Sequence, residues 1–138
     1  MERRLEKILL VEDDPDIAFL VGMTLKKLGG FDVRHADCGL SALKIIDGFA
    51  PDLVVLDVMM PQMDGPETLR HIRMRPPGAE VPAVFMTARV QNHEIQTYLD
   101  LGAIGVITKP IKSDTLCETL RGLWETYNAG QRKIEARG

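Results

Sequence analysis

Five short strand-like runs recur along this chain, and the segments between them space their apolar residues as helices do. The predicted strands are Ile8–Val11, Phe31–His35, Leu53–Leu56, Ala83–Met86 and Gly105–Thr108. Continuous apolar runs such as Ile8–Val11 and Leu53–Leu56, bounded by turn residues, are typical of strands buried on both faces of a parallel sheet. The pattern therefore predicts a sheet of five short strands.

The intervening segments carry the signals that begin and end helices. Asp14 and Pro15 begin the first helix, because an acidic cap and a proline in the first turn suit a helix N-terminus. Gly29-Gly30 ends it. Later helices are predicted at Gly39–Phe49, at Asp64–Arg75, in a weaker segment that ends at Gly102, and after a cap at Ser113 or Asp114. The inward positions of the first two helices are predicted to be Ile17, Leu20, Val21, Leu25, Leu28, Leu40, Leu43 and Ile46.

Strands and helices thus alternate along all 138 residues. Parallel strands need crossover connections, and right-handed crossovers place helices on both faces of a sheet. The alternation predicts an α/β fold, a three-layer sandwich around a mostly parallel five-stranded sheet. The length suits a single domain. The polar residues 131–138 are expected to form a frayed end.

Polar side chains end four of the predicted strands. Glu12 and Asp13 follow the first strand, Asp57 follows the third, and Thr87 and Lys109 close the fourth and fifth. Ligands of open α/β sheets bind at the carboxyl ends of the strands, so these groups are expected to meet in one crevice. Carboxylates, a hydroxyl and an ammonium together indicate a site for a phosphate and a divalent cation.

Composition narrows the class of protein. The net charge of −3 argues against a nucleic-acid surface, and no apolar stretch approaches the roughly 18 residues needed to cross a bilayer. Cys38 and Cys117 lack metal spacing, so both are predicted to be free thiols of a cytoplasmic protein. His35, His71 and His93 are scattered along the chain and are expected to be solvated or satisfied by hydrogen bonds rather than catalytic.

Four motifs, in order along the chain, resemble those of a known family. They are Val11-Glu12-Asp13-Asp14-Pro15, Leu56-Asp57-Val58-Met59-Met60-Pro61 through Met63-Asp64-Gly65, Met86-Thr87-Ala88, and Thr108-Lys109-Pro110. Over about residues 6–128 the chain resembles the receiver domain of two-component response regulators, with 129–138 left as a short polar tail. The resemblance implies a flavodoxin-like fold with strand order 2-1-3-4-5 and a cis peptide before Pro110.

The resemblance implies that Asp57 accepts a phosphoryl group from a histidine kinase or a histidine phosphotransfer protein. A carboxylate can hold that group as an acyl phosphate, and Mg²⁺ can offset the repulsion among the acids. Asp13 and Asp57 are expected to be direct ligands, and Glu12 to act at least partly through water. By resemblance, the backbone carbonyl of Met59 completes the set. Asp14 is better explained as a helix cap than as a ligand.

Thr87 and Lys109 are expected to position and stabilise the transferred group, without acting as acid or base. The chain is then a signalling protein and not an enzyme, and it acts by changing its contacts with a downstream protein. The resemblance places the partner surface on the face formed by the fourth helix, fifth strand and fifth helix. The same face leaves a phosphorylation-linked homodimer open.

Three positions add detail. Val106 stands where most relatives have a Tyr or Phe that swings inward as the threonine moves. An aliphatic side chain cannot make that change in burial, so Val106 is expected to be plain core and the output to use other shifts. Met59 and Arg89, by resemblance, flank the path of attacking water and are expected to tune the lifetime of the phosphoryl group.

Two other functions compete with this interpretation. A phosphorylation-independent binding module would keep the acidic pocket without the switch, and Val106 is the only feature that favours it. A small aspartate-nucleophile phosphatase would need a substrate cap and a general acid two residues after Asp57, where Met59 stands.

Gly65 suits either a tight turn beside the site or merely the start of the third helix.

Overall fold

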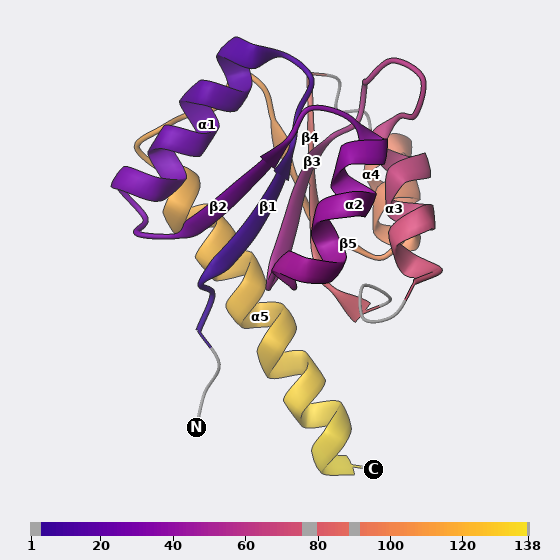
Figure 1. Cartoon of the computed structure of the whole chain (residues 1–138). Helices are drawn as coiled ribbons and strands as arrows, with labels where there is room; N and C mark the ends of the chain where they lie inside the picture. The colour runs from indigo at the N-terminus through magenta and orange to yellow at the C-terminus, as the bar shows by residue number, and fades with distance from the viewer. Residues whose placement is uncertain (1–3, 76–79, 89–91, 138) are drawn as a thin grey trace.

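Five parallel strands form one sheet in the order β2-β1-β3-β4-β5. In this computed structural model, which describes residues 4–75, 80–88 and 92–137, helices cover both faces of the sheet (Figure 1). The strands are β1 (Lys7–Val11), β2 (Asp32–Ala36), β3 (Leu53–Asp57), β4 (Ala83–Thr87) and β5 (Ala103–Thr108). The predicted three-layer α/β fold and its strand order are confirmed, and the strand ends differ from the predicted ones by at most two residues.

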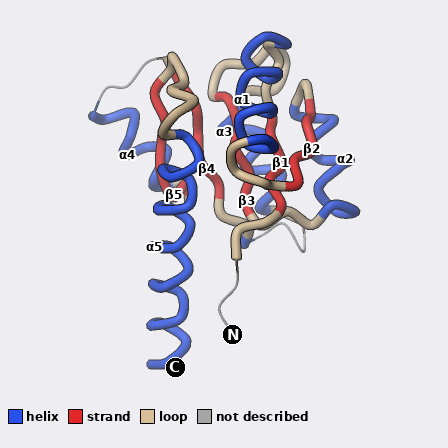
Figure 2. Tube along the Cα trace, turned by 90° about the vertical axis from the view of Figure 1, so that its left-hand side faces the viewer, coloured by secondary structure: helices blue, strands red, loops and turns tan. Residues whose placement is uncertain are grey.

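The helices divide between the two faces of the sheet. They are α1 (Pro15–Lys27), α2 (Gly39–Phe49), α3 (Gly65–Arg73), α4 (Asn92–Asp100) and α5 (Leu116–Arg137). Helices α1 and α5 cover one face, and α2, α3 and α4 cover the other (Figures 1 and 2). The direction of strand addition reverses after β2, so right-handed crossovers place α1 and the next three helices on opposite sides.

Two apolar clusters fill the space between the layers. Leu9, Leu56 and Phe85 belong to the cluster under α2, α3 and α4, and Leu10 and Val55 to the cluster under α1 and α5. The central strands β1, β3 and β4 therefore need apolar residues on both faces, which explains their continuous apolar runs. Consecutive residues of one strand end up in different clusters because strand side chains alternate between faces.

Three leucines that were predicted to face inward do not. Leu20, Leu28 and Leu40 are 44%, 67% and 58% exposed. The buried stripe of α1 consists of Ala18, Val21, Thr24 and Leu25, and Leu28 lies past the end of the helix at its C-cap. Helical spacing shows which residues share a side, but the width of the covered strip depends on what packs against it.

Helix α5 differs most from the prediction. It begins at Leu116, after a turn over residues 113–115, and continues to Arg137 through the end that was expected to fray. Residues 129–137 contain no proline, and strong helix formers such as Lys133, Glu135 and Ala136 follow Gly130, so nothing stops the helix. Figure 1 shows its C-terminal part extending past the sheet.

Aromatic side chains anchor the middle of α5. The indole N–H of Trp124 donates to the backbone oxygen of Asp52 at 3.2 Å, and the Tyr127 hydroxyl donates to the backbone oxygen of Glu80 at 3.4 Å. Trp124 is also buried in the core under α1 and α5. These contacts hold α5 against the end of the sheet opposite the acidic residues.

Candidate functional site

Three carboxylates meet where β1 and β3 end side by side. Glu12 and Asp13 follow β1, Asp57 is the last residue of β3, and one oxygen from each lies within 4.8 Å of the others. Glu12 is 0% and Asp57 4% exposed, whereas Asp13 is exposed at the mouth of the site. The predicted convergence of these three acids is confirmed.

Lys109 joins two of these acids. Its Nζ donates to Oε1 of Glu12 at 3.0 Å and lies 3.0 Å from Oδ1 of Asp57. The Lys109 backbone N–H donates to the oxygen of Thr87 at 2.9 Å, and the peptide before Pro110 is cis, as the resemblance implies. A residue 97 positions from Glu12 in the chain thus supplies the positive charge of the site.

Thr87 lies at the same end of the sheet and is 3% exposed. Asp57 pairs in register with Met86, the residue before Thr87, and Thr87 pairs with Thr108, the residue before Lys109. The parallel register therefore places the carboxylate, hydroxyl and ammonium groups on three neighbouring strand ends. All the described residues predicted for the reaction lie at this one edge.

Burial and the hydrogen bonds between Lys109 and the acids shift the pKa values of the site in opposite directions. Burial raises the pKa of Glu12 from 4.5 to about 7; the hydrogen bond from Lys109 opposes this shift, and the charge of Asp57 adds to it. For Lys109, burial alone would lower the pKa, but the hydrogen bonds to Asp57 and Glu12 raise it overall. Lys109 consequently keeps its positive charge at neutral pH, and Glu12 is poised to gain or lose a proton there.

The shifted Glu12 predicts that the stability of the ion-free protein falls as pH rises from about 5 to about 7. Its pKa in the folded state lies above its ordinary value of 4.5, so the folded protein binds more protons than the unfolded chain in this window. The contribution is fully present below pH 4.5 and is lost above about 7. Denaturant unfolding in a chelator across this range measures the slope.

Glu12→Gln is the matched control for this prediction, because glutamine keeps the size and polarity of the side chain but cannot titrate. We expect the variant to lack the Glu12 part of the pH slope. Identical slopes in the wild type and Glu12→Gln would contradict the assignment.

The loop after β3 lies close against the backbone of Asp57. The N–H of Gly65 donates to the oxygen of Val58 at 2.9 Å, and a Cβ at position 65 would lie 2.2 Å from the backbone oxygen of Asp57. Gly65 therefore serves the close turn beside the site as well as beginning α3. In the same loop Met60 is buried, but Met59 is 72% exposed. Packing in the core therefore does not explain why a methionine stands at position 59.

The neighbouring helix cap is as predicted. Oδ1 of Asp14 accepts from the N–H groups of Asp16 at 2.9 Å and Ile17 at 3.3 Å. A contact that the sequence pattern does not predict lies nearby: Nε2 of His35 donates to the backbone oxygen of Glu12 at 2.8 Å. Parallel pairing of β1 with β2 brings these two residues together, and the contact helps to hold the Glu12 peptide in place.

Two other positions named from the sequence, Arg89 and Val106, are not part of the acidic cluster as the structure describes it. Arg89 lies outside the described residues. Val106 is half-buried and packs against the cluster that contains Phe85 and Tyr98, which agrees with its interpretation as core.

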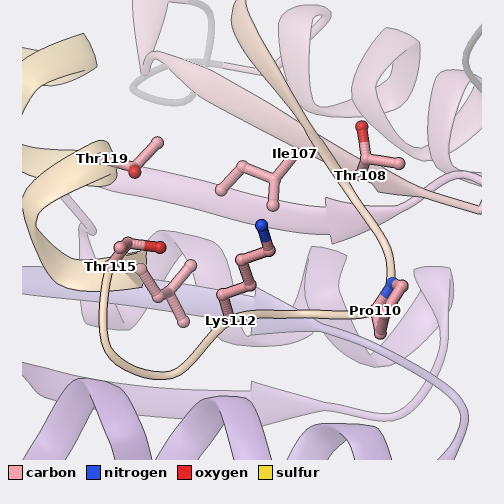
Figure 3. A pocket seen from close by; sticks show the side chains of 7 residues that line it. Ile107, Thr108, Pro110, Lys112, Thr115 and Thr119 are labelled. Atoms are coloured by element: carbon pink, nitrogen blue, oxygen red, sulfur yellow. The ribbon is translucent and has the colours of Figure 1, made fainter.

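A separate hollow lies beside Pro110, between the end of β5 and the start of α5. It measures about 220 Å³ and is lined by Ile107, Thr108, Pro110, Lys112, Thr115, Leu116 and Thr119 (Figure 3). Its polar lining consists of hydroxyls and one ammonium, and none of the three clustered acids lines it. This hollow is therefore not part of the acidic site.

The donor set at the acidic site fits a small divalent cation. The site holds three carboxylates, and the ammonium of Lys109 pairs with two of them, Glu12 and Asp57, so negative charge is in excess among the described groups. The available donors are oxygens, which Mg²⁺ and Ca²⁺ prefer over nitrogen or sulfur. Within the described part of the chain, this is the group of His, Cys, Asp and Glu side chains whose spacing suits a metal ion.

The fold and this edge of acids, hydroxyl and ammonium define a class of small α/β proteins whose site lies at the switch point of the sheet. A model of the response regulator receiver domain matches residues 8–121, and the chain belongs to this family of two-component signalling proteins.

Individual relatives agree with this assignment. The transcriptional regulatory protein TrcR of Mycobacterium tuberculosis is 40% identical over 117 residues, which are 85% of this chain and 44% of TrcR. The Regulator of RpoS of Escherichia coli K12 is 37% identical over 107 residues, 78% of this chain and 31% of that protein. The chain thus spans less than half the length of these curated relatives.

Solved structures show the same fold. The chemotaxis protein CheY4 of Vibrio cholerae superposes with a TM-score of 0.80 at 30% identity and covers 86% of this chain and 98% of its own. NtrX from Brucella abortus gives a TM-score of 0.81 at 31% identity over 94% of this chain and 29% of NtrX. Among the described helices, none combines the length and the apolar character that a membrane span requires.

Proposed function

We propose that this receiver domain takes a phosphoryl group from a phosphohistidine onto Asp57 in a Mg²⁺-dependent reaction, and that it signals through altered contacts with another protein. The observation that carries the proposal is the environment of Asp57. Its carboxylate is almost fully buried, is paired with Lys109 at 3.0 Å, and lies in a cluster with Glu12 and Asp13. A buried acid with these partners suits a phosphoryl acceptor better than a structural ion pair.

In the proposed transfer, one carboxylate oxygen of Asp57 forms a bond to phosphorus while the phosphorus–nitrogen bond of the donor breaks. The electron pair of that bond stays on the imidazole nitrogen of the donor. The product is an acyl phosphate on Asp57. Burial limits the access of bulk water to this product, which favours a lifetime long enough for signalling.

Lys109 and Thr87 stabilise the charge on the transferred group. Lys109 already points its ammonium at Oδ1 of Asp57, so it can donate to a phosphoryl oxygen placed on that carboxylate with little rearrangement. Thr87 ends the neighbouring strand and can donate its hydroxyl to another phosphoryl oxygen. Phosphoryl transfer depends mainly on such positioning and charge stabilisation.

The residues that would hold Mg²⁺ are Asp13, Asp57, Glu12 and the backbone carbonyl of Met59. When bound, the cation offsets the repulsion between the acids and the incoming phosphoryl group. Glu12 also accepts from Lys109, so it restrains the ammonium at the same time. Met59 and Arg89 are retained as candidates for tuning the phosphoryl lifetime.

We assign the phosphoryl donor to a helical surface of a histidine kinase or phosphotransfer protein, which docks beside the site on α1. Phe19, Leu20 and Met23 are 71%, 44% and 38% exposed and lie on the outer side of this helix. The helix begins at Pro15, directly after the acidic residues, so Phe19 is about 6 Å along the helix from its start. An exposed apolar patch at this distance suits a partner that must bring a histidine to Asp57.

Phe19→Ser is expected to slow phosphoryl transfer from a phosphohistidine protein about tenfold or more, because a buried apolar contact of the complex is lost. Labelling by acetyl phosphate, which needs no docking, should be unchanged. Met74→Ser is the control, because Met74 is 77% exposed but lies at the end of α3. Equal loss with both donors would show that Phe19 supports the fold and not the docking.

The same proposal treats the chain as a signalling protein of the cytoplasm and not as an enzyme. The output surface is assigned to α4, β5 and α5, where a downstream protein or a second copy of the chain can bind. TrcR is named as a transcriptional regulator, but the match covers 44% of that protein, so we assign no nucleic-acid contact to this chain.

Incubation with Mg²⁺ and acetyl phosphate separates the candidate functions. One phosphoryl group per chain, stable in acid and labile in base, supports the receiver. Continuous turnover of a small phosphoester supports a phosphatase, and the exposed Met59 in place of a general acid argues against that outcome. No adduct would indicate a phosphorylation-independent binding module.

A further inference from the structure

Few side chains of helix α4 are buried in the part of the helix whose side chains the structure describes. Among its described side chains, from His93 to Asp100, Tyr98 is the only buried one, with 9% of its surface exposed. Helix α5, by contrast, buries Leu116, Cys117, Leu120 and Trp124 in the cluster it shares with α1. A displacement of α4 must therefore alter the contacts of Tyr98.

The ring of Tyr98 contacts the strand that ends at the site. Its centroid lies 5.1 Å from that of Phe85, with the rings tilted by 50°. Phe85 lies two residues before Thr87 on β4, so both side chains point to the same face of the sheet. Phe85 also pairs in register with Val106 of β5. Tyr98 of α4 thus supplies an aromatic ring to the cluster against which Val106 packs.

The electrostatic surroundings of Tyr98 include the loop after β3. Burial raises the pKa of the Tyr98 phenol, and the charges of Glu94 and Asp64 raise it further, so Asp64 lies within electrostatic reach of the ring hydroxyl. Asp64 caps α3 in the loop after β3, and the next residue, Gly65, presses on the backbone of Asp57. Movement of either β4 or this loop therefore changes the surroundings of Tyr98.

The other neighbour of β5 is held firmly. A Cβ at Gly105 would lie 2.6 Å from Cδ1 of Leu123, so β5 and α5 are in direct contact. Arg121 of α5 also donates to the backbone oxygen of Gly29 at 2.6 Å. With α5 fixed on one side and a single buried anchor on the other, α4 is the element that can shift at low cost.

We infer that Tyr98 is the side chain through which a change at Asp57 and Thr87 reaches α4. This inference rests on the proposed function, because it needs Asp57 to be modified. When Thr87 moves toward the modified carboxylate, it displaces the end of β4, and Phe85 transmits the displacement to the ring of Tyr98. Packed cores respond to such shifts by changing between discrete arrangements. Helix α4, and with it one side of the output surface, then changes position.

Fluorine NMR spectroscopy tests the role of Tyr98 directly, since the chain has two tyrosines, Tyr98 and Tyr127. In protein labelled with 3-fluorotyrosine, Mg²⁺ and beryllofluoride should move the Tyr98 resonance and leave the Tyr127 resonance in place. Tyr98→Phe assigns the signals. If beryllofluoride binds to the wild type and the Tyr98 resonance does not move, the inference is wrong but the proposed function is not contradicted.

Absence of bound beryllofluoride, which is seen through its own fluorine signals, would contradict the proposed function and the inference with it. Hydrogen exchange over residues 92–100 provides a second measurement on the unlabelled protein. We expect beryllofluoride to change exchange there in the wild type and in Tyr98→Phe, which keeps the ring. Tyr98→Ala should bind beryllofluoride without that response.

Leu99→Ala is the matched control on the same helix, since Leu99 is 40% exposed and its truncation leaves the anchor intact. Its response should equal that of the wild type. A normal response in Tyr98→Ala, or a response lost equally in Leu99→Ala, would show that Tyr98 does not carry the coupling.

Discussion

Asp57→Asn is expected to reduce the phosphoryl adduct formed with acetyl phosphate and Mg²⁺ to about 1% of the wild-type level or less, because a neutral amide oxygen is a far weaker nucleophile than a carboxylate. The substitution keeps the size of the side chain. It also leaves Lys109 paired with Glu12, so the fold should persist. Mass spectrometry of the intact chain, together with thermal unfolding of the variant, measures both effects.

The matched control is Asp14→Asn. Asparagine caps helices about as well as aspartate, so the bonds that Asp14 accepts from Asp16 and Ile17 can be kept while a nearby charge is removed. We expect this variant to form the adduct at a level close to that of the wild type. An adduct that survives in Asp57→Asn, or that disappears equally in both variants, would contradict the assignment of Asp57 as the acceptor.

Gly65→Ala is expected to destabilise the fold by about 2–3 kcal/mol, because its methyl group meets backbone that cannot rotate away. The added carbon would lie 2.2 Å from the oxygen of Asp57 and 3.0 Å from Cα of Val58. To relieve this overlap, the loop and the end of β3 must separate, which weakens the bond from the Gly65 N–H to Val58. Denaturant unfolding gives the loss in free energy.

The same variant should also accept phosphate more slowly, because the backbone of Asp57 itself is displaced. Gly48→Ala is its control: apart from its own helix backbone, no heavy atom lies within 4 Å of the added carbon, and the residue is inside α2. Alanine there should stabilise the protein by about 0.5–1 kcal/mol through helix propensity. If Gly65→Ala were as stable as Gly48→Ala, the close approach described for Gly65 would be wrong.

Strong local signals explain why much of the fold could be predicted. Leu53–Leu56 is a continuous apolar run of the kind typical of a strand buried on both faces. Asp14-Pro15 is a helix start, and the hydrogen bonds of its cap join neighbouring residues. Helix α2 was predicted with the same ends that it has, Gly39 and Phe49. Each of these features depends on residues that are close together in the chain.

Other features depended on packing and could not be predicted. Leu40 satisfies the helical spacing of α2 but is exposed, because none of the described elements covers that side of the helix. The polar end of the chain carries no apolar stripe to indicate a helix, yet α5 continues to Arg137. The contact of His35 with Glu12 follows from strand pairing, which spacing along the chain does not reveal.

The sequence alone determined the alternation of strands and helices and the presence of Glu12, Asp13, Asp57, Thr87 and Lys109 at strand ends, because both are written in local order along the chain. Only the tertiary structure decided that Lys109 bonds to Glu12 and Asp57, that Gly65 presses on Asp57, and that Tyr98 of α4 supplies the ring facing Phe85. These contacts join residues from separate strands, helices and loops. They exist only once parallel pairing and helix packing have set the distances between segments.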